Sequence, residues 1–361
     1  MRVPRRKSMV MSSHVPFCCK SGMSPFPPIR ELRDVSATQF REEILPALQP
    51  VVLRGLVAGW PAVHAGRDSP RVMANYLRGF DTGSSADTMF GDVSIGGRFF
   101  YNDELTGHNF QRRPQRIVDS LERLLALLDD PAPPALYVGA VPTPSSLPGF
   151  TRDNTIDLVD ATVAPRVWIG NRVTVQTHYD ISNNIACVVA GRRRFTLFPP
   201  EQLDNLYVGP LEFTLAGQPI SMVRLDQPDF ERFPRFREAL ASAQAADLEP
   251  GDALFVPYMW WHHVESRERF NVLVNYWWDD TPVWQGSPFE ALLHGIMAVK
   301  SLPPDKRRIW RKVFEHYVFE DGGDPVAHLN QRQRGIQGTA SPQLAEIIRA
   351  QLLHTLSRRR W

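Results

Sequence analysis

The sequence predicts a double-sheet jelly roll of antiparallel strands, with helices added before and after it. Short apolar runs separated by glycine and proline fill the stretch 166–279. Helical apolar spacing occurs on both sides of it, at 36–128 and again beyond Pro288. We therefore expect an all-β core at 166–280, a helix and strand region at 29–165, and helices at 281–361.

The N-terminal region alternates between helix and strand patterns. Ser36 and Gln39 have the spacing of a capping box, and apolar residues at helical spacing follow them. Pro114 is expected to open a helix that runs through Leu128, since proline favours the first helical turn. Residues 1–28 lack periodicity, so we expect a disordered tail there. The other expected elements are a helix from Ser69-Pro70 and strands at 50–55, 88–90, 98–101 and 136–139.

The core and the C-terminal region have different periodicities. Apolar runs predict the core strands, and a helical insertion is expected among them. Beyond the core, the apolar spacing becomes helical. The expected strands are 173–175, 185–190, 195–198, 254–256 and 271–278, and the expected helices are 234–245, 289–300, 305–319 and 342–356.

Composition is that of an ordinary soluble protein. The 361 residues are 43% hydrophobic and 22% charged, with a net charge of +2. Neither a nucleic-acid nor a membrane partner is expected, and Arg358-Arg359-Arg360 is interpreted as a solvated helix end. Cys18, Cys19 and Cys187 are too few for a disulfide framework, so we expect a reducing, cytoplasmic location.

Two short stretches carry the residue types of a metal site. His178 and Asp180 lie two positions apart, so on a strand both side chains point to one face. His262 would complete a set of two imidazoles and one carboxylate. Such a set leaves three positions of an octahedral metal open and is typical of non-haem Fe(II) oxygenases. A single His-x-Asp triplet is common by chance, so the prediction depends on the strand patterns around it.

Several motifs, in this order, resemble the cupin-like JmjC domain family. The resemblance covers roughly positions 50–279. Within the family, the sequence is similar to asparaginyl hydroxylases of the factor-inhibiting-HIF type, and the segment at 192–200 is more like that of bacterial members. It implies an Fe(II)- and 2-oxoglutarate-dependent oxygenase that consumes O2 and hydroxylates an unidentified protein or small molecule. The motifs are His178-Tyr179-Asp180, Asn184, Gly191-x-Arg193, Leu197-Phe198-Pro199-Pro200, Pro250-Gly251-Asp252, Val256-Pro257 and Trp260-Trp261-His262-His263-Val264.

The resemblance also implies roles for individual residues. The family's metal ligands fall on His178, Asp180 and His262, with His263 as the alternative third ligand. Its lysine anchor for the far carboxylate of 2-oxoglutarate falls on Arg193, which can form a bidentate pair with a carboxylate.

Further co-substrate contacts are implied less directly. Tyr137 falls on a tyrosine that assists the anchor, and Asn184 and Asn275 fall on asparagines near the metal-proximal end. The family's threonine before the first ligand is replaced by Val175, so Thr174 or Thr177 is expected to make that contact. Tyr101 falls near a substrate-contacting tyrosine, and Pro219-Ile220 stands where the family's substrate-binding Arg-Gln pair is expected.

Two other function classes remain open. One is a non-catalytic metal-binding module, and the other is a cupin dioxygenase or isomerase that works without 2-oxoglutarate. The triad together with a basic anchor favours the oxygenase. Apolar stripes at 289–319 also predict a homodimer through the C-terminal helices, as in the resembling hydroxylases.

Overall fold

The computed structural model describes residues 25–215 and 217–358. Most of the expected tail at 1–28 lies outside these residues, as do Cys18, Cys19, Arg359 and Arg360. By its internal contacts the chain divides into two units, Met1–Asp279 and Asp280–Trp361.

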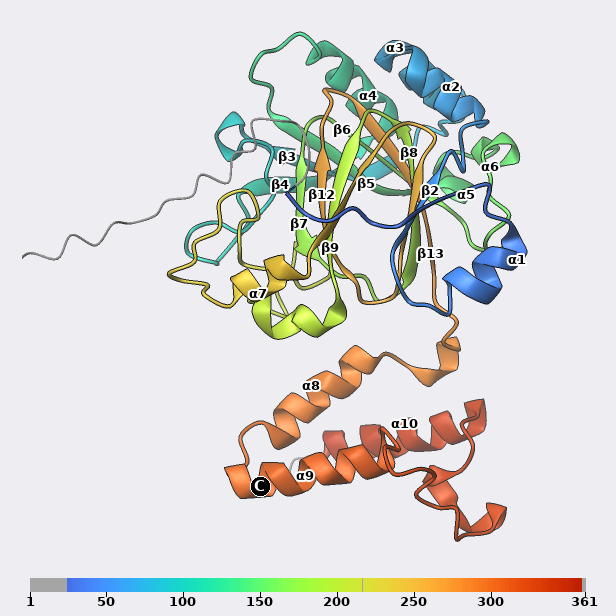
Figure 1. Ribbon diagram of the computed structural model, residues 1–361, viewed down its shortest axis with the longest axis vertical. Helices are drawn as coiled ribbons and strands as arrows, with labels where there is room; N and C mark the ends of the chain where they lie inside the picture. Colours follow the sequence, from blue (N-terminus) through green and yellow to red (C-terminus); the bar gives the residue numbers. More distant parts are fainter. Residues whose placement is uncertain (1–24, 216, 359–361) are drawn as a thin grey trace, which may run out of the picture. The chain divides into compact units, whose positions relative to one another are not determined.

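The first unit contains two β-sheets, and the predicted jelly-roll core is confirmed (Figure 1). Neighbouring strands in the core are antiparallel, whereas β1 and β2 are parallel. The nine-stranded sheet has the order β1 (Glu31–Arg33), β2 (Val51–Arg54), β11 (Ala253–Val256), β8 (Asn183–Ala190), β13 (Asn271–Trp278), β6 (Arg166–Gly170), β5 (Ala135–Pro142), β3 (Ser85–Gly91) and β4 (Phe110–Arg116). The four-stranded sheet has the order β10 (Gln244–Leu248), β9 (Arg193–Phe198), β12 (Trp261–Ser266) and β7 (Thr174–His178).

Helices cover the outer face of the large sheet (Figure 1). Side chains of α2, α3 and α4 share one apolar cluster with β8, β13 and β6, because alternate residues of these strands point outward. The α3 helix starts as predicted, with Ser69 capping it and Pro70 in its first turn. The helices of this unit are α1 (Ala37–Gln39), the π-helical turn η1 (Phe40–Ile44), α2 (Pro61–Asp68), α3 (Pro70–Arg78), α4 (Ile117–Ala126), α5 (Thr143–Ser146), α6 (Phe150–Asp153), the 3₁₀ turns η2 (Val93–Ile95) and η3 (Pro200–Asn205), and α7 (Phe236–Ala241).

A second apolar cluster lies between the two sheets. It is built from the other face of each strand, for example Val188 and Leu254 of the large sheet and Leu197 and Val264 of the small one. Part of this cluster, including Ala186, Phe195 and Val264, also borders the cavity between the sheets, where polar residues join it.

Three sequence predictions in this unit are wrong. Pro114 lies in β4, an edge strand that tolerates a missing N–H, and the helix begins only at Ile117. The expected helix at 234–245 ends at Ala241, and β10 follows from Gln244 to pair with β9. The expected strand at 98–101 forms only isolated bridges.

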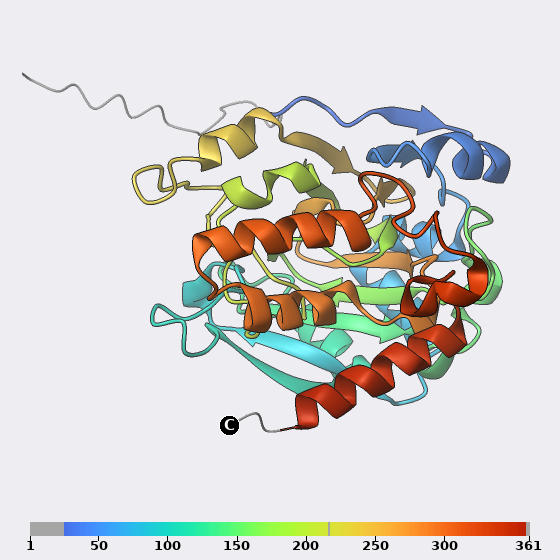
Figure 2. The same ribbon diagram turned by 90° about the horizontal axis from the view of Figure 1, so that it is seen from below.

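The second unit is helical. Its main helices are α8 (Pro288–Val299), α9 (Pro304–Tyr317) and α10 (Pro342–Ser357), each capped or opened by proline close to the predicted start. Loops join the three helices (Figure 2), and the loop between α9 and α10 contains the 3₁₀ turns η5 (Gln331–Gln333) and η6 (Gly335–Gln337). A further 3₁₀ turn, η4 (Val283–Gln285), precedes α8. No residue of the three main helices is buried, although their faces carry many large apolar side chains. Within the described residues no helix is long and apolar enough to cross a membrane.

Candidate functional site

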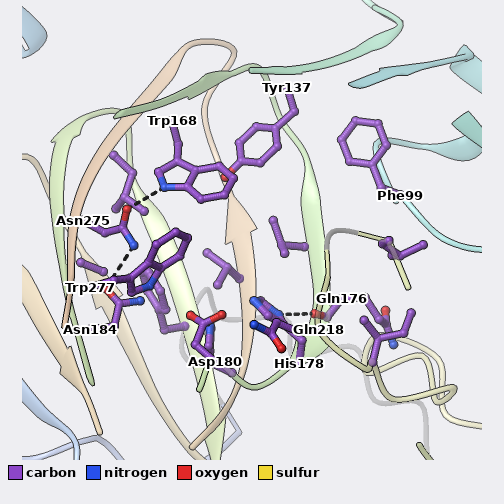
Figure 3. Close-up of a pocket in the computed structure, with 18 of the residues that line it drawn as sticks. Phe99, Tyr137, Trp168, Gln176, His178, Asp180, Asn184, Gln218, Asn275 and Trp277 are labelled. Atoms are coloured by element: carbon purple, nitrogen blue, oxygen red, sulfur yellow. Dashed lines mark hydrogen bonds and ion pairs between the residues drawn. The ribbon is translucent and has the colours of Figure 1, made fainter. Parts of the chain in front are cut away.

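A cavity of about 300 Å³ opens between the two sheets (Figure 3). Both sheets contribute to its wall, because inward-pointing residues of their strands converge there. Almost all of the residues predicted for the site border it. The predicted residues in its lining are Tyr137, His178, Asp180, Asn184, Arg193, His262 and Asn275.

The structure brings His178, Asp180 and His262 together. One nitrogen or oxygen atom from each lies within 4.8 Å of the other two, a spacing that suits a single metal ion. His178 is the last residue of β7 and is paired with His262 on β12, so the two rings lie 4.2 Å apart. Asp180 follows β7 directly and places a carboxylate oxygen 3.6 Å from Nε2 of His262.

Backbone carbonyls orient both imidazole rings. Nδ1 of His178 lies 2.8 Å from the carbonyl oxygen of Gln176, and Nδ1 of His262 lies 3.0 Å from that of Trp260. With the proton on Nδ1, each ring turns the lone pair of Nε2 toward the shared space. Burial lowers the pKa of His262 to about 4, so this ring is neutral at pH 7, as a metal ligand must be.

His263 lies on the other side of β12. Its Nδ1 is 3.2 Å from the hydroxyl of Thr177, and the residue does not line the cavity. Neighbouring residues of a strand point to opposite faces, so only His262 of the pair can face His178. The geometry thus places His262, and not His263, with His178 and Asp180.

A β-bulge in β7 decides which of its residues face the cavity. The register passes from His262 opposite His178 to Val264 opposite Val175, which leaves one extra residue on β7. Val175 and His178 therefore both line the cavity, although they are three positions apart. Thr174 does not line it, and Thr177 points to His263, so neither threonine is brought to the expected contact.

Arg193 lies at the start of β9 and is 1% exposed. Within the described residues, none of its three guanidinium nitrogens has a hydrogen-bond partner of normal geometry. The Tyr137 hydroxyl is close to it: burial raises the pKa of Tyr137, and the Arg193 charge offsets part of that rise. A buried cation without an anionic partner is costly, so this arrangement suits a ligand that brings its own negative charge.

Asn184, Asn275 and Trp168 form a hydrogen-bonded row on the large sheet. The indole N–H of Trp168 donates to Oδ1 of Asn275 at 2.8 Å, and Nδ2 of Asn275 makes a longer contact of 3.4 Å with Oδ1 of Asn184. Both asparagines are buried, and β8 and β13 hold them side by side.

Sequence reasoning missed several aromatic lining residues. Trp168 stacks on Tyr137 with ring centroids 5.5 Å apart, and Trp277 meets Trp168 edge to face at 5.7 Å. Phe99 completes this wall beside Tyr137. Trp277 is in phase with Asn275 on one strand, so inward periodicity in β13 was the signal that could have identified it.

The residues that stand at the family's substrate-contacting positions are only partly at the cavity. Ile220 lines it and is bridged to His178, whereas Pro219 does not line it. Tyr101 is buried outside the lining and donates its hydroxyl to the carbonyl of Phe213 at 2.5 Å.

Comparisons with known proteins agree with this geometry. A model of the cupin-like domain family matches residues 37–283. The tRNA wybutosine-synthesizing protein 5 of Mus musculus is 26% identical over 275 residues, which cover 71% of this chain and 79% of that protein. Jumonji C domain-containing protein 5 of Drosophila melanogaster is 27% identical over 268 residues, or 70% of this chain and 60% of that protein.

A shorter stretch is similar to lysine-specific demethylase JMJ31 of Arabidopsis thaliana, with 39% identity over 102 residues. That match covers 28% of this chain and only 18% of the demethylase. The narrower likeness to asparaginyl hydroxylases of bacterial type stays a prediction. The matched region contains both sheets and the whole triad, and the chain therefore belongs to the cupin-like domain family of JmjC type, whose members use Fe(II) and 2-oxoglutarate.

Proposed function

We propose that this protein is an Fe(II)- and 2-oxoglutarate-dependent oxygenase that hydroxylates a C–H bond of a protein or small molecule and releases succinate and CO2. One observation supports it above the others. A single cavity contains both a His-Asp-His triad and a buried arginine that has no acidic partner and no hydrogen bond of normal geometry among the described residues. A metal-binding module without catalysis would need only the triad, and a dioxygenase that works without 2-oxoglutarate would not need the arginine.

The donor set fits Fe(II). Two imidazole nitrogens and one carboxylate oxygen, supplied by His178, Asp180 and His262, are the ligands of the facial triad. The Oδ2 atom of Asp180 is buried and has no hydrogen-bond partner among the described residues, which is expected of an oxygen that a metal satisfies.

The opposite side of the cavity fits the far carboxylate of 2-oxoglutarate. Figure 3 shows Tyr137 away from His178 and Asp180, and Arg193 lies beside Tyr137. The guanidinium group can donate two parallel hydrogen bonds to a carboxylate, and the Tyr137 hydroxyl can donate a third. Asn184 and Asn275 lie on the metal side and are proposed to contact the keto-acid end.

When bound, iron and 2-oxoglutarate supply the oxidising chemistry, with O2 as the oxidant. The chain's own residues bind, orient and shield these groups. Arg193 and Tyr137 fix the far end of the co-substrate, and the backbone carbonyls behind His178 and His262 keep both rings in one tautomer. Trp168 and Phe99 give this cavity an apolar wall beside the polar groups.

The test is anaerobic titration of 2-oxoglutarate into the Fe(II)-loaded protein. We expect a visible metal-to-ligand charge-transfer band that saturates with co-substrate, followed by succinate formation when O2 is admitted. Asp180→Ala should abolish the band, whereas His263→Ala, on the other side of the same strand, should keep it. A wild-type protein that binds Fe(II) but gives neither band nor succinate contradicts the proposal.

A homodimer is proposed as the assembly state. The support comes from α8, α9 and α10, which expose Leu292, Met297, Trp310 and Leu353 at 46–63% of their full area while burying no residue of their own. Exposed apolar faces of this extent are typical of protein interfaces.

A further inference from the structure

Trp277 lines the cavity, and its indole N–H has no hydrogen-bond acceptor among the described residues. It lies near the end of β13, directly paired with Asn184 on β8. Residues 275 and 277 point to the same face of the strand, and both line the cavity. Figure 3 shows the Trp277 indole between Asn184 and Asp180, on the metal side of the cavity.

The indole N–H of Trp277 is buried and has no acceptor among the described residues. Other tryptophans of this unit are satisfied within the protein: Trp60 donates to the carbonyl of Thr155 at 2.9 Å, and Trp168 donates to Asn275 at 2.8 Å. A buried donor without an acceptor is destabilising, and native proteins retain such groups mainly where a ligand, ion or water completes them. The orphaned N–H of Trp277 therefore indicates a missing acceptor inside the cavity.

The position of the indole limits what that acceptor is. The apolar wall of Tyr137 and Phe99 lies elsewhere, and the anchor Arg193 lies beside Tyr137. An acceptor next to Trp277 must therefore be at the metal-proximal end of a bound co-substrate.

We propose that the Trp277 indole N–H donates a hydrogen bond to the metal-proximal carboxylate of the bound 2-oxo acid. This inference rests on the proposed function. It assigns Trp277 a binding role beside Asn184 and Asn275, and it makes the 2-oxo acid contact the large sheet through three side chains on β8 and β13. A hydrogen bond to an ionised oxygen is stronger than one between neutral groups, so its loss is measurable as affinity.

Two other acceptors give different experimental signatures. The unpaired Oδ2 of Asp180 could accept the N–H once a metal ion reorients the carboxylate. In that case metal alone satisfies the indole. A trapped water would satisfy it before any ligand is added. Under the proposal, the N–H changes only when the 2-oxo acid itself binds.

The experiment follows the indole N–H directly by NMR. The full-length protein carries ¹⁵N-labelled tryptophan and is loaded with Zn(II), a diamagnetic substitute for Fe(II). The Trp277 resonance is identified by its loss in Trp277→Phe and, independently, through the backbone assignment of Trp277. Spectra are compared for the metal-free protein, the Zn(II) form, and the Zn(II) form with 2-oxoglutarate.

We expect the indole proton to move downfield and to exchange more slowly with solvent only in the third sample. In parallel, Trp277→Phe should weaken 2-oxoglutarate binding roughly ten-fold or more, as the loss of a charge-assisted hydrogen bond predicts. The matched control is Trp60→Phe, which loses an indole N–H on the outer side of the large sheet and should bind with wild-type affinity.

The outcomes separate this inference from the proposed function. If wild type does not bind 2-oxoglutarate at all, the proposed function fails. If wild type binds it while the indole resonance stays unchanged, or responds fully to Zn(II) alone, only the role of Trp277 is wrong. If Trp277→Phe does not fold, the wild-type spectra still decide between these outcomes.

Discussion

Replacing Arg193 by methionine should weaken co-substrate binding and stabilise the ligand-free protein at the same time. The side chain is 1% exposed, and within the described residues its guanidinium has no hydrogen-bond partner of normal geometry. It therefore pays a desolvation cost that only a bound anion offsets. Methionine has a similar length and carries no charge, so it removes both the cost and the anchor.

Both effects have a predicted size. Hydrogen bonds to a charged group contribute about 1.5–3 kcal/mol, so the dissociation constant of 2-oxoglutarate should rise about 10- to 150-fold. An unsatisfied buried group costs about 1–3 kcal/mol, and in a domain of this size each kcal/mol moves Tm by about 2–4 °C. The metal-free, ligand-free variant should thus melt roughly 2–12 °C higher than wild type.

Two matched variants isolate the cause. Arg193→Lys keeps the charge and should retain part of the affinity, with no gain in Tm. Arg194→Met removes the neighbouring cation, which pairs with Asp247 at 2.6 Å outside the cavity, and should leave 2-oxoglutarate binding unchanged. Affinity is measured by calorimetry with Mn(II) in place of iron, and Tm by differential scanning. An Arg193→Met protein with normal affinity, or with a lower Tm than wild type in the absence of ligand, would refute the reasoning.

Three further predictions concern other parts of the molecule. His262→Ala should abolish Fe(II) binding in equilibrium dialysis, whereas His263→Ala should bind Fe(II) normally; the reverse pattern would show that the third ligand is wrongly assigned. Burial between Phe110 and Phe213 lowers the pKa of His108, so the unfolded chain binds the proton more readily and stability is lost as pH falls below about 6.5. His108→Gln should reduce this loss of unfolding free energy between pH 7 and pH 5, measured by urea titration. An equal dependence of stability on pH in both proteins would exclude His108 as its source. Light scattering should give about twice 41 kDa, and an aspartate at the exposed Leu292 should yield monomer or insoluble protein; a soluble wild-type monomer at micromolar concentration would contradict the dimer.

The His178 and Asp180 pair and the core strands were predictable because their signals are local, whereas His262 came from the family resemblance. His178 and Asp180 lie two positions apart, and the apolar runs of β8, β11 and β13 are buried on both faces, as their composition indicates. The helix that was expected at Pro114 illustrates the limit. The helix itself is present from Ile117, but whether a proline opens a helix or sits in an edge strand depends on the neighbouring strand β3.

The contact expected of Thr174 depends on long-range register. The bulge opposite His262 and Val264 turns Thr174 away from the cavity, and no residue type in β7 announces it. Likewise, the lack of a well-formed hydrogen bond at the Arg193 guanidinium and at the Trp277 indole N–H, within the described residues, is a property of the packed sheets. Sequence could propose Arg193 through its position in a motif, but only the packed structure shows these unsatisfied donors.

The position of β12 determines the stage of folding at which the three metal ligands come together. In the small sheet β12 lies between β9 and β7, so before it inserts there is no continuous ladder between them. His262 lies on this strand and reaches His178 only when β12 is paired with its neighbours β9 and β7. A chain that ends before β12 would present His178 and Asp180 without His262, which is two of the three ligands. Pairing of β12 with both β9 and β7 is therefore the step that completes the metal site.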